Sequence, residues 1–447
     1  MTDSNTLEDG RETVRSEITK VLRYHCEPLP APERADEFAL FFDRFGDARV
    51  VLLGEATHGT SEFYRARAAI TERLVGRHGF TFVAVEADWP DAARIDRYVR
   101  HREALAGAGE PFARFPTWMW RNTEVHAFAD WLRDHNKPLP PDRRVSFHGL
   151  DIYSLSASIE AVINYLDKVN PKAALTARRR YGCLTPWQDE PEAYGYGVLS
   201  GKSDSCEDEA VAQLTDMLSE RLRYTGQDSE AYFDAAQNAR IVRAAEQYYR
   251  IMYRRSRESW NLRDRHMFET LQALLRSRGP NSKAVVWAHN SHIGNAAATA
   301  MGWQGEFNVG ELCRTAYGDE AVLIGFGTDR GTVAAASDWG RPMEVKTVRP
   351  ARRDSYEYAF RMTGLSRALT DWRRRPHEEL ASALREPLLE RAIGVVYRPD
   401  TEYLSHYFEA VLSEQFDAYV WLEETHAVTS LPGGRPHGAP ETYPFGL

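Results

Sequence analysis

The chain has 447 residues, of which 43% are hydrophobic and 27% charged, and its net charge is −9. This composition is typical of a globular protein and excludes a disordered or fibrous chain. An acidic chain lacks the basic field that a general phosphate-backbone binder needs, so we expect no nucleic-acid partner. The chain has no run of 18 apolar residues, and its first residues lack the apolar core of a secretory signal. We therefore expect no membrane span and a cytoplasmic protein.

The four cysteines, Cys26, Cys183, Cys206 and Cys313, are widely spaced and form no CxxC motif. This pattern predicts neither a zinc ribbon nor a disulfide scaffold, and it is typical of a reducing compartment. We interpret Cys183 and Cys206 as inert small residues.

Short apolar runs of strand length recur along the chain. Most are continuous rather than alternating, which is typical of strands buried on both faces. The runs are Arg49–Leu53, Phe80–Val85, Val145–His148, Ala284–Ala288, Ala321–Phe326, Ala392–Tyr397 and Phe416–Leu422, and two further extended segments are expected within Gly331–Val348. Helical patterns over Glu62–Arg77 and Pro90–Glu103 lie between the first of these runs. This alternation predicts the α/β class, with a central, mostly parallel sheet flanked by helices.

Residues 152–278 interrupt the alternation and predict one helix after another, over Leu155–Val169, Glu207–Tyr224 and about Ser229–Arg276. We interpret this block as a large helical insertion over the carboxyl edge of the strands. The expected division is residues 1–151 for the first part of the core, 152–280 for the insertion or cap, and 281–447 for the second part of the core. Within the cap, Thr185–Gly201 is rich in glycine, proline and tyrosine and is a candidate lid loop.

Titratable residues follow four of the predicted strands. They are Glu55 and His58 in the segment GEATHG, then Glu86 and Asp88, then Asp151, and finally His289 and His292. Because ligands bind beyond the carboxyl ends of parallel strands, this placement predicts an active site there. Glycines on both sides of GEATHG favour a loop whose backbone can approach a ligand.

Each candidate also has a structural interpretation. Glu55 suits a helix N-terminus, where acidic residues are favourable, and His289 could be a satisfied core histidine. Glu86 and Asp88 could end a strand in solvent. Trp118 and Trp120 fit a core or a pocket wall equally well.

Several catalytic motifs are absent: GxSxG, Walker A, GxGxxG and HExxH. A serine or cysteine nucleophile therefore has no support in the sequence. The remaining histidines, carboxylates and arginines suit general-base activation of water, or a metal site. Two alternatives stay open: a metal-dependent hydrolase in which His58, His289 and carboxylates hold a divalent ion, and a non-enzymatic small-molecule binding protein.

The segments LLGEATHGTSEFYRARAAITERLV, FVAVEADWPDA, MWRNTEV, FHGLDIYS, NLRDRHM, VVWAHNSHIGN and YRPDTEYLSHYFEAVLSEQFDAYVWLEETHAV resemble the erythromycin esterase family. The resemblance extends over roughly residues 40–428. The family includes macrolide-inactivating esterases and relatives associated with succinoglycan biosynthesis. The resemblance implies a hydrolase that cleaves a carboxylic ester, with macrolactones among the candidate substrates, by water attack without a covalent intermediate.

The resemblance also implies roles for individual residues. His58 matches the family's general base and Glu55 its partner, while Arg67, His289 and Glu86 match further active-site positions. A second group is expected to line the substrate site: Asp88, Trp89, Trp118, Trp120, Arg121, Asp151 and His292. No metal or other cofactor is implied, the expected partner is a small-molecule ester, and the oligomeric state is left open.

Overall fold

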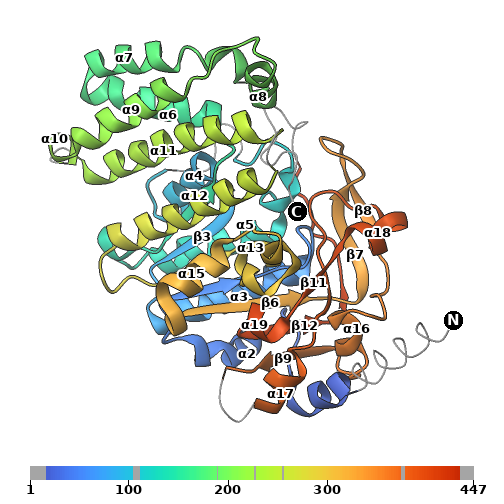
Figure 1. Ribbon diagram of the computed structural model, residues 1–447. Helices are drawn as coiled ribbons and strands as arrows, with labels where there is room; N and C mark the ends of the chain where they lie inside the picture. The colour runs from blue at the N-terminus through green and yellow to red at the C-terminus, as the bar shows by residue number, and fades with distance from the viewer. Residues whose placement is uncertain are drawn as a thin grey trace.

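Most of the predicted apolar runs pair into one eight-stranded sheet, in the order β1-β9-β12-β6-β2-β5-β3-β4 (Figure 1). The computed structural model describes residues 17–103, 111–188, 190–225, 228–253, 256–373 and 378–432. Neighbouring strands from β12 to β4 are parallel, whereas β9 runs antiparallel to both β12 and β1. The sheet strands are β1 (Glu27–Pro28), β2 (Val50–Leu53), β3 (Phe82–Asp88), β4 (Ser146–Asp151), β5 (Ala284–Trp287), β6 (Ala321–Gly327), β9 (Arg367–Asp371) and β12 (Ala418–Leu422). The expected α/β fold with a mostly parallel sheet is confirmed.

The register of the central strands brings three chain segments to one level. Leu53 at the end of β2 pairs with Trp287 of β5, and Trp287 pairs in turn with Val85 of β3. The residues that follow Leu53, Val85 and Trp287 therefore lie at the same edge of the sheet. These following residues include Glu55, Glu86 and His289.

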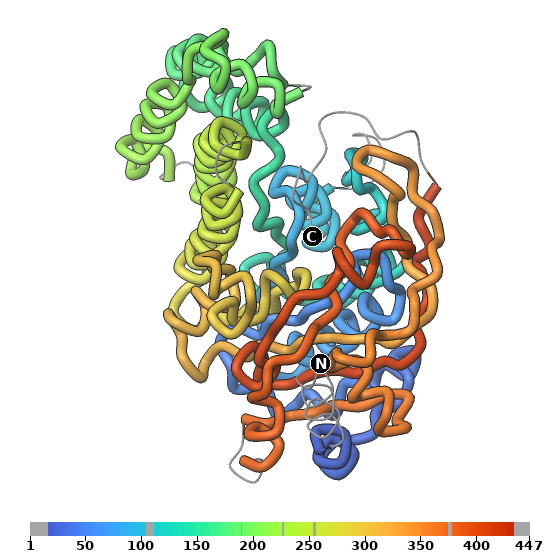
Figure 2. Tube along the Cα trace, turned by 45° about the vertical axis from the view of Figure 1, so that its right-hand side comes forward, coloured from blue at the N-terminus to red at the C-terminus, as the bar shows by residue number. Residues whose placement is uncertain are grey.

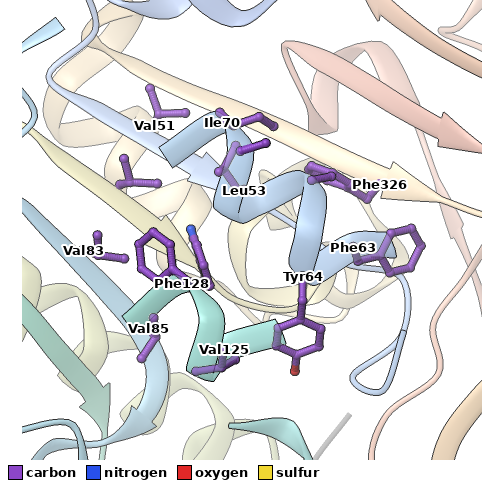
Figure 3. Close-up of a cluster of buried hydrophobic side chains, with 14 of the residues drawn as sticks. Val51, Leu53, Phe63, Tyr64, Ile70, Val83, Val85, Val125, Phe128 and Phe326 are labelled. Atoms are coloured by element: carbon purple, nitrogen blue, oxygen red, sulfur yellow. The ribbon is translucent and has the colours of Figure 1, made fainter. Parts of the chain in front are cut away.

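Helices cover both faces of the sheet because its strands are apolar on both sides. Val51 and Leu53 join the hydrophobic cluster beneath α3 (Ser61–His78) and α5 (Thr123–Asn136), part of which Figure 3 shows. Val50 and Leu52 join the cluster on the opposite face. That second cluster includes side chains of α12 (Ser256–Ser277) and α15 (Val309–Tyr317).

The helical region between β4 and β5 forms an arm beside the sheet (Figures 1 and 2). It has a hydrophobic cluster of its own, which includes Tyr153, Tyr194 and Tyr249. Its helices are α6 (Leu155–Val169), α7 (Pro171–Tyr181), α8 (Pro191–Leu199), α9 (Glu207–Ser219), α10 (Arg221–Thr225), α11 (Ser229–Ile251) and α12. The single long helix expected over Ser229–Arg276 is thus two helices, α11 and α12.

The described residues of Thr185–Gly201 are mostly helical, so the prediction of a loop there is wrong, while a role as a lid stays a prediction. A short 3-10 turn spans Thr185–Trp187, and α8 follows with Pro191 in its first turn. Tyr194 donates a hydrogen bond to Glu246 of α11 (2.6 Å), and a Cβ on Gly195 would lie 1.9 Å from the Tyr249 carbonyl oxygen. The glycine therefore permits tight helix packing rather than loop motion.

Cys183 and Cys206, at either end of this segment, form a disulfide. The interpretation of these two residues as inert is therefore wrong. Their spacing of 23 residues matches no short cysteine motif, so the pairing could not be predicted from the sequence. Cys26 and Cys313 are free and buried.

Two smaller sheets complete the core. β7 (Arg330–Ala336) pairs with β8 (Met343–Val348) and β13 (Glu424–Thr425), and β10 (Leu388–Arg391) pairs with β11 (Tyr407–Ala410). β7 and β8 confirm the two extended segments expected in this region. The remaining helices are α2 (Ala35–Ala39), α4 (Trp89–Val99), α13 (Asn290–Ile293), α14 (Ala300–Trp303), α16 (Tyr356–Arg361), α17 (Glu378–Ala383), α18 (Glu402–Ser405) and α19 (Leu412–Gln415). No helix in the described ranges is long and apolar enough to cross a membrane.

Candidate active site

The GEATHG segment forms a buried loop between β2 and α3, and distant parts of the chain hold its backbone. The His58 N–H donates to the Ile393 carbonyl (3.3 Å), and the Ile393 N–H donates to the Ala56 carbonyl (2.8 Å). The Gly59 carbonyl accepts from the N–H groups of Ala334 (3.0 Å) and Val428 (2.9 Å). The loop is therefore fixed by backbone contacts rather than free to move.

These contacts explain a wrong strand prediction. Ala392–Tyr397 is apolar and extended but belongs to no sheet strand, and makes single bridges instead, among them Ile393 with Thr57 and Val396 with Ala336. Its backbone bonds to the loop that carries His58, while the Ile393 and Tyr397 side chains pack with those of β7 and β8. A buried extended segment has the same apolar composition as a buried sheet strand, so composition alone predicted a strand here.

Glu55 joins His58 to Arg67 in a buried chain of polar groups. Glu55 Oε1 lies 3.0 Å from His58 Nδ1, and Glu55 Oε2 accepts a hydrogen bond from Arg67 Nη2 (2.7 Å). A carboxylate can only accept, so His58 carries a proton on Nδ1. Arg67 is fully buried between the rings of Tyr64 and Trp287, at 4.4 and 5.2 Å from their centroids.

His289 is held in the opposite tautomer. It caps α13, and its Nδ1 accepts from the Ser291 N–H (3.2 Å) and lies 2.9 Å from Ser291 Oγ. The proton must therefore sit on Nε2, which is buried and has no well-aligned hydrogen-bond partner in the described ranges. Burial, and then the nearby His58, hold the pKa of His289 well below its usual range, so the ring is neutral.

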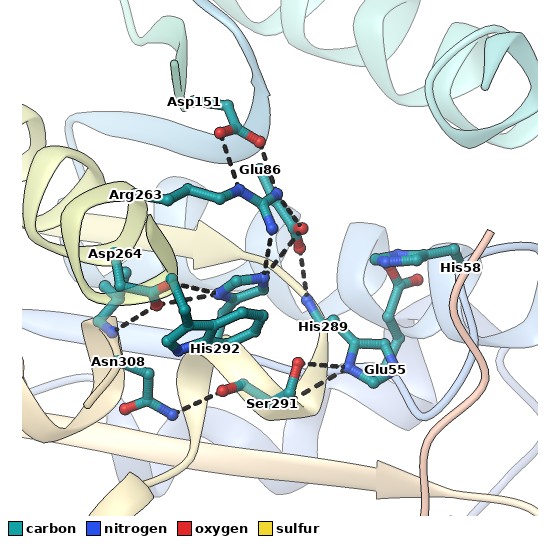
Figure 4. A network of polar contacts seen from close by, with 12 residues as sticks. Glu55, His58, Glu86, Asp151, Arg263, Asp264, His289, Ser291, His292 and Asn308 are labelled. Carbon is teal, nitrogen blue, oxygen red and sulfur yellow. Dashed lines mark hydrogen bonds and ion pairs between the residues drawn. The ribbon is translucent and has the colours of Figure 1, made fainter. Parts of the chain in front are cut away.

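The two imidazoles lie side by side, with ring centroids 4.9 Å apart and planes inclined by 51°. Figure 4 shows them next to Glu55 at one end of a larger polar network. Each ring is held through its Nδ1, His58 by Glu55 and His289 by Ser291.

Glu86 is the centre of that larger network. Its Oε2 accepts from the His289 main-chain N–H (2.9 Å), and its Oε1 accepts from Arg263 Nη2 (2.7 Å) and lies 3.2 Å from His292 Nε2. Burial would raise the pKa of Glu86, but His292, Arg263 and His58 outweigh burial and hold that pKa well below its usual range. Glu86 is thus a buried carboxylate that fixes the backbone of His289.

His292 is occupied on every side. Its Nδ1 lies 2.9 Å from Asp264 Oδ1, and its ring stacks on Trp260 with centroids 4.6 Å apart. Burial would lower the pKa of His292, but Asp264 and Glu86 raise it to about 9. The resulting imidazolium lies 3.0 Å from Arg263 Nη1, and the surrounding carboxylates offset this contact between two cations. With both nitrogens engaged, His292 is placed to support Glu86 rather than to touch a substrate.

Arg263 connects this network to β4. Its Nε and Nη2 form two hydrogen bonds with Asp151 (3.0 and 2.7 Å), and its guanidinium lies 5.1 Å from the centroid of the Tyr153 ring. Glu55, Glu86, Asp151 and His289 therefore belong to one connected site, at the sheet edge where their strands end. Arg263 satisfies the Asp151 carboxylate from α12.

Three other predicted residues have local partners instead. Asp88 pairs with Arg114, and Trp89 donates to Asp234 of α11 (2.7 Å) while it stacks on His148. Arg121 donates to the Pro432 carbonyl and so joins the segment before α5 to the end of the described chain. The contacts of Trp89 and Arg121 are structural, so no substrate contact is assigned to either.

The two remaining tryptophans are buried. Trp120 donates to the Glu86 carbonyl (3.0 Å) and packs against the edge of Tyr64, which connects it to the site. Trp118 packs edge-on against Phe115 in the adjoining core. Trp120 thus lies next to the site, and Trp118 lies in the core beside it.

Arg263, Asp264 and Ser291 were not among the predicted site residues. A signal was present for the first two, because an adjacent Arg-Asp pair lies on the buried face of α12. Such a pair needs partners across the fold. Ser291 gave no signal, since its role depends on the short turn that returns its N–H to His289.

The donor set does not resemble a common metal centre. In the described part of the chain, no group of three or more His, Cys, Asp or Glu side chains has an arrangement that could hold a metal ion. Glu55, Glu86 and Asp264 already accept hydrogen bonds or pair with cations. Any metal would have to displace these partners.

Comparisons with known proteins identify the family of this chain. Residues 75–425 match the sequence profile of the family described as erythromycin esterase. The erythromycin esterase type II of Escherichia coli is 21% identical over 410 residues, which cover 87% of this chain and 93% of that protein. Among solved structures, a succinoglycan biosynthesis protein superposes with a TM-score of 0.77 at 22% identity, over 94% of this chain and 99% of that one. An erythromycin esterase mutant in its open conformation gives a TM-score of 0.61 at 16% identity, over 90% and 98% of the two chains. The chain therefore belongs to the erythromycin esterase family.

Proposed function

We propose that the protein is a hydrolase that cleaves a carboxylic ester by direct attack of water. The observation that supports this proposal is the pair of adjacent imidazoles. Glu55 holds a proton on His58 Nδ1, so Nε2 is the basic nitrogen of that ring when it is neutral, and Ser291 donates to His289 Nδ1, so that ring carries its proton on Nε2. A base beside a donor is what addition of water to a carbonyl requires.

In the proposed reaction, His58 Nε2 takes a proton from water as the water oxygen attacks the ester carbonyl carbon. Charge develops on the carbonyl oxygen, and the His289 Nε2–H stabilises it. Arg67 neutralises the Glu55 carboxylate (2.7 Å), which keeps the His58 tautomer fixed through the proton transfer. The protonated His58 then donates its proton to the leaving alkoxide as the C–O bond breaks, which restores the resting state.

The experiment compares turnover of a macrolide panel and simple aryl esters by the wild type and by His58→Asn, with product masses measured. Loss of a general base costs roughly 10²- to 10⁴-fold in turnover. His126→Asn, at a half-exposed surface site, is the matched control and should retain activity. Equal turnover by wild type and His58→Asn would contradict the proposal. The panel also tests whether a macrolactone is the substrate.

Metal dependence is the alternative that chelation tests. Turnover should survive exhaustive dialysis against a chelator, because the carboxylates around His58 and His289 already have partners. Loss of activity on chelation, with recovery on addition of one particular divalent ion, would favour the metal-dependent mechanism instead.

A further inference from the structure

A second pair of buried carboxyls lies behind the site. Glu390 lies in β10 and Glu357 lies in α16, and both side chains are fully buried. No arginine or lysine side chain in the described ranges forms an ion pair with either, and the Oε2 atom of each has no hydrogen-bond partner there. Arg391 acts on Glu357 as a nearby positive charge, whereas no cation in the described part of the chain acts in this way on Glu390, whose burial favours the neutral carboxyl.

Asn290 connects Glu390 to the catalytic loop. Its Nδ2 donates to Glu390 Oε1 (2.9 Å), and its amide also forms two hydrogen bonds with the backbone of Phe326. The Asn290 main-chain N–H donates to the Glu55 carbonyl (2.9 Å). Because Asn290 directly follows His289, its position bears on both imidazoles of the site.

The loop is built to receive this asparagine. A Cβ on Gly54 would lie 2.1 Å from Asn290 Oδ1, so a larger residue there would push the amide away. The first glycine of GEATHG therefore permits the close approach of Asn290 to the backbone that carries Glu55.

We propose that Glu390 is a positioning residue of the hydrolytic site, which holds Asn290 in place and thereby fixes Glu55 relative to His289. This inference rests on the proposed function. Glu390 touches neither imidazole, and it acts only through Asn290.

The groups around Glu390 indicate whether its carboxyl is neutral or ionised when it holds Asn290. It faces Glu357 of α16, Gln415 of α19 and Tyr419 of β12, and the adjacent Arg391 side chain is bound to Glu402 and to backbone carbonyls. Burial, and then Glu357, raise the pKa of Glu390 to about 8. Glu390 is therefore neutral at pH 7, and its ionisation at higher pH would place a negative charge beside Glu357.

The test is the pH profile of kcat for 4-nitrophenyl acetate. In the wild type, kcat should fall as the pH rises through about 8, because ionised Glu390 shifts Asn290. Glu390→Gln stays neutral and keeps an oxygen for Asn290, so it should retain turnover at pH 7 and lose this alkaline fall. Glu357→Gln removes the like charge and should move the fall to lower pH. Glu390→Ala should lower kcat about 10²-fold with KM nearly unchanged, since misplacement by about 1 Å has that effect.

A second measurement does not depend on turnover. In histidine-labelled protein, the NMR signals of the His58 imidazole should shift in Glu390→Ala and stay at wild-type positions in Glu390→Gln. Unchanged His58 signals in Glu390→Ala would overturn the positioning role, as would a Glu390→Gln profile with the wild-type alkaline fall. If wild type and His58→Asn turn over the ester equally, the proposed function fails, and the NMR result alone then decides this inference.

Discussion

At the scale of single residues, Glu55 has two roles: it fixes the His58 tautomer and it pairs with Arg67. The substitution Glu55→Gln tests both. Glu55→Gln keeps the size of the side chain but cannot fix the His58 tautomer by charge, and it leaves the fully buried Arg67 without its carboxylate. We expect folded protein with kcat lowered by at least about 10-fold, which corresponds to roughly 1.4 kcal/mol in the barrier. Circular dichroism and steady-state kinetics on the same preparation check this. Wild-type kcat in a folded Glu55→Gln protein would leave Glu55 with only a structural role.

Ser291 tests the absence of a covalent intermediate. Its hydroxyl lies 2.9 Å from His289 Nδ1, so it is the serine best placed to mimic a nucleophile. In our mechanism it only orients the ring, and its main-chain N–H keeps that role when the hydroxyl is removed. Ser291→Ala should therefore retain most of the turnover, and serine-directed phosphonates should not label the wild type. Stoichiometric labelling of Ser291, or a rapid-quench burst that disappears in Ser291→Ala, would show that an acyl-enzyme forms.

At the scale of secondary-structure elements, α12 contributes one cation that several acids depend on. Arg263 pairs with Glu86 and Asp151 in a fully buried setting, so Arg263→Met leaves both carboxylates without it. Breaking a buried pair by removal of one partner costs about 3–5 kcal/mol. We expect a large fall in Tm, measured by calorimetry. Arg265→Met, two residues along and exposed, is the matched control and should change Tm little; equal effects of the two substitutions would contradict the assigned role.

The elements also show what the sequence alone can predict. Continuous apolar runs located most strands of the parallel sheet, because a strand that is buried on both faces has an uninterrupted run of apolar residues. The same pattern misled at Ala392–Tyr397, whose backbone bonds to the catalytic loop instead of joining the main sheet. The short antiparallel strand β9 was missed, since five residues with polar ends resemble a loop.

The site could be predicted in part for a related reason. Glu55, Glu86, Asp151 and His289 lie at the ends of neighbouring strands, so topology brings them together. Arg263 and Asp264 come from a helix more than 100 residues away from Glu86 and Asp151, and no local pattern reports such a contact. The glycine-rich segment of α8 was taken for a loop because close helix packing and loop flexibility both favour glycine.

At the scale of the whole molecule, the buried titratable groups predict how stability depends on pH. The Asp264 and Glu86 carboxylates raise the pKa of His292 to about 9, from about 6.5 in an unfolded chain. Protonation of His292 therefore stabilises the fold fully below about pH 6.5, and this contribution is lost as the pH rises through about 9. Glu390 acts in the same direction, because its pKa of about 8 exceeds the ordinary carboxyl value and its neutral form is favoured in the fold.

Both groups bind more protons in the folded chain than in the unfolded chain between about pH 6.5 and 8, so their contribution to the free energy of unfolding decreases with rising pH there. Buried neutral histidines such as His289 act in the opposite direction near pH 6, where the unfolded chain would protonate them, so Tm should fall in the wild type from about pH 7.5 to pH 9. Glu390→Gln removes one of the two groups, so its Tm should fall less steeply with rising pH. Glu124→Gln changes a buried carboxyl that is hydrogen-bonded to Ser61, and its Tm should follow that of the wild type. A wild-type Tm that is constant or rises over this range would show that neither His292 nor Glu390 holds its extra proton in the folded state.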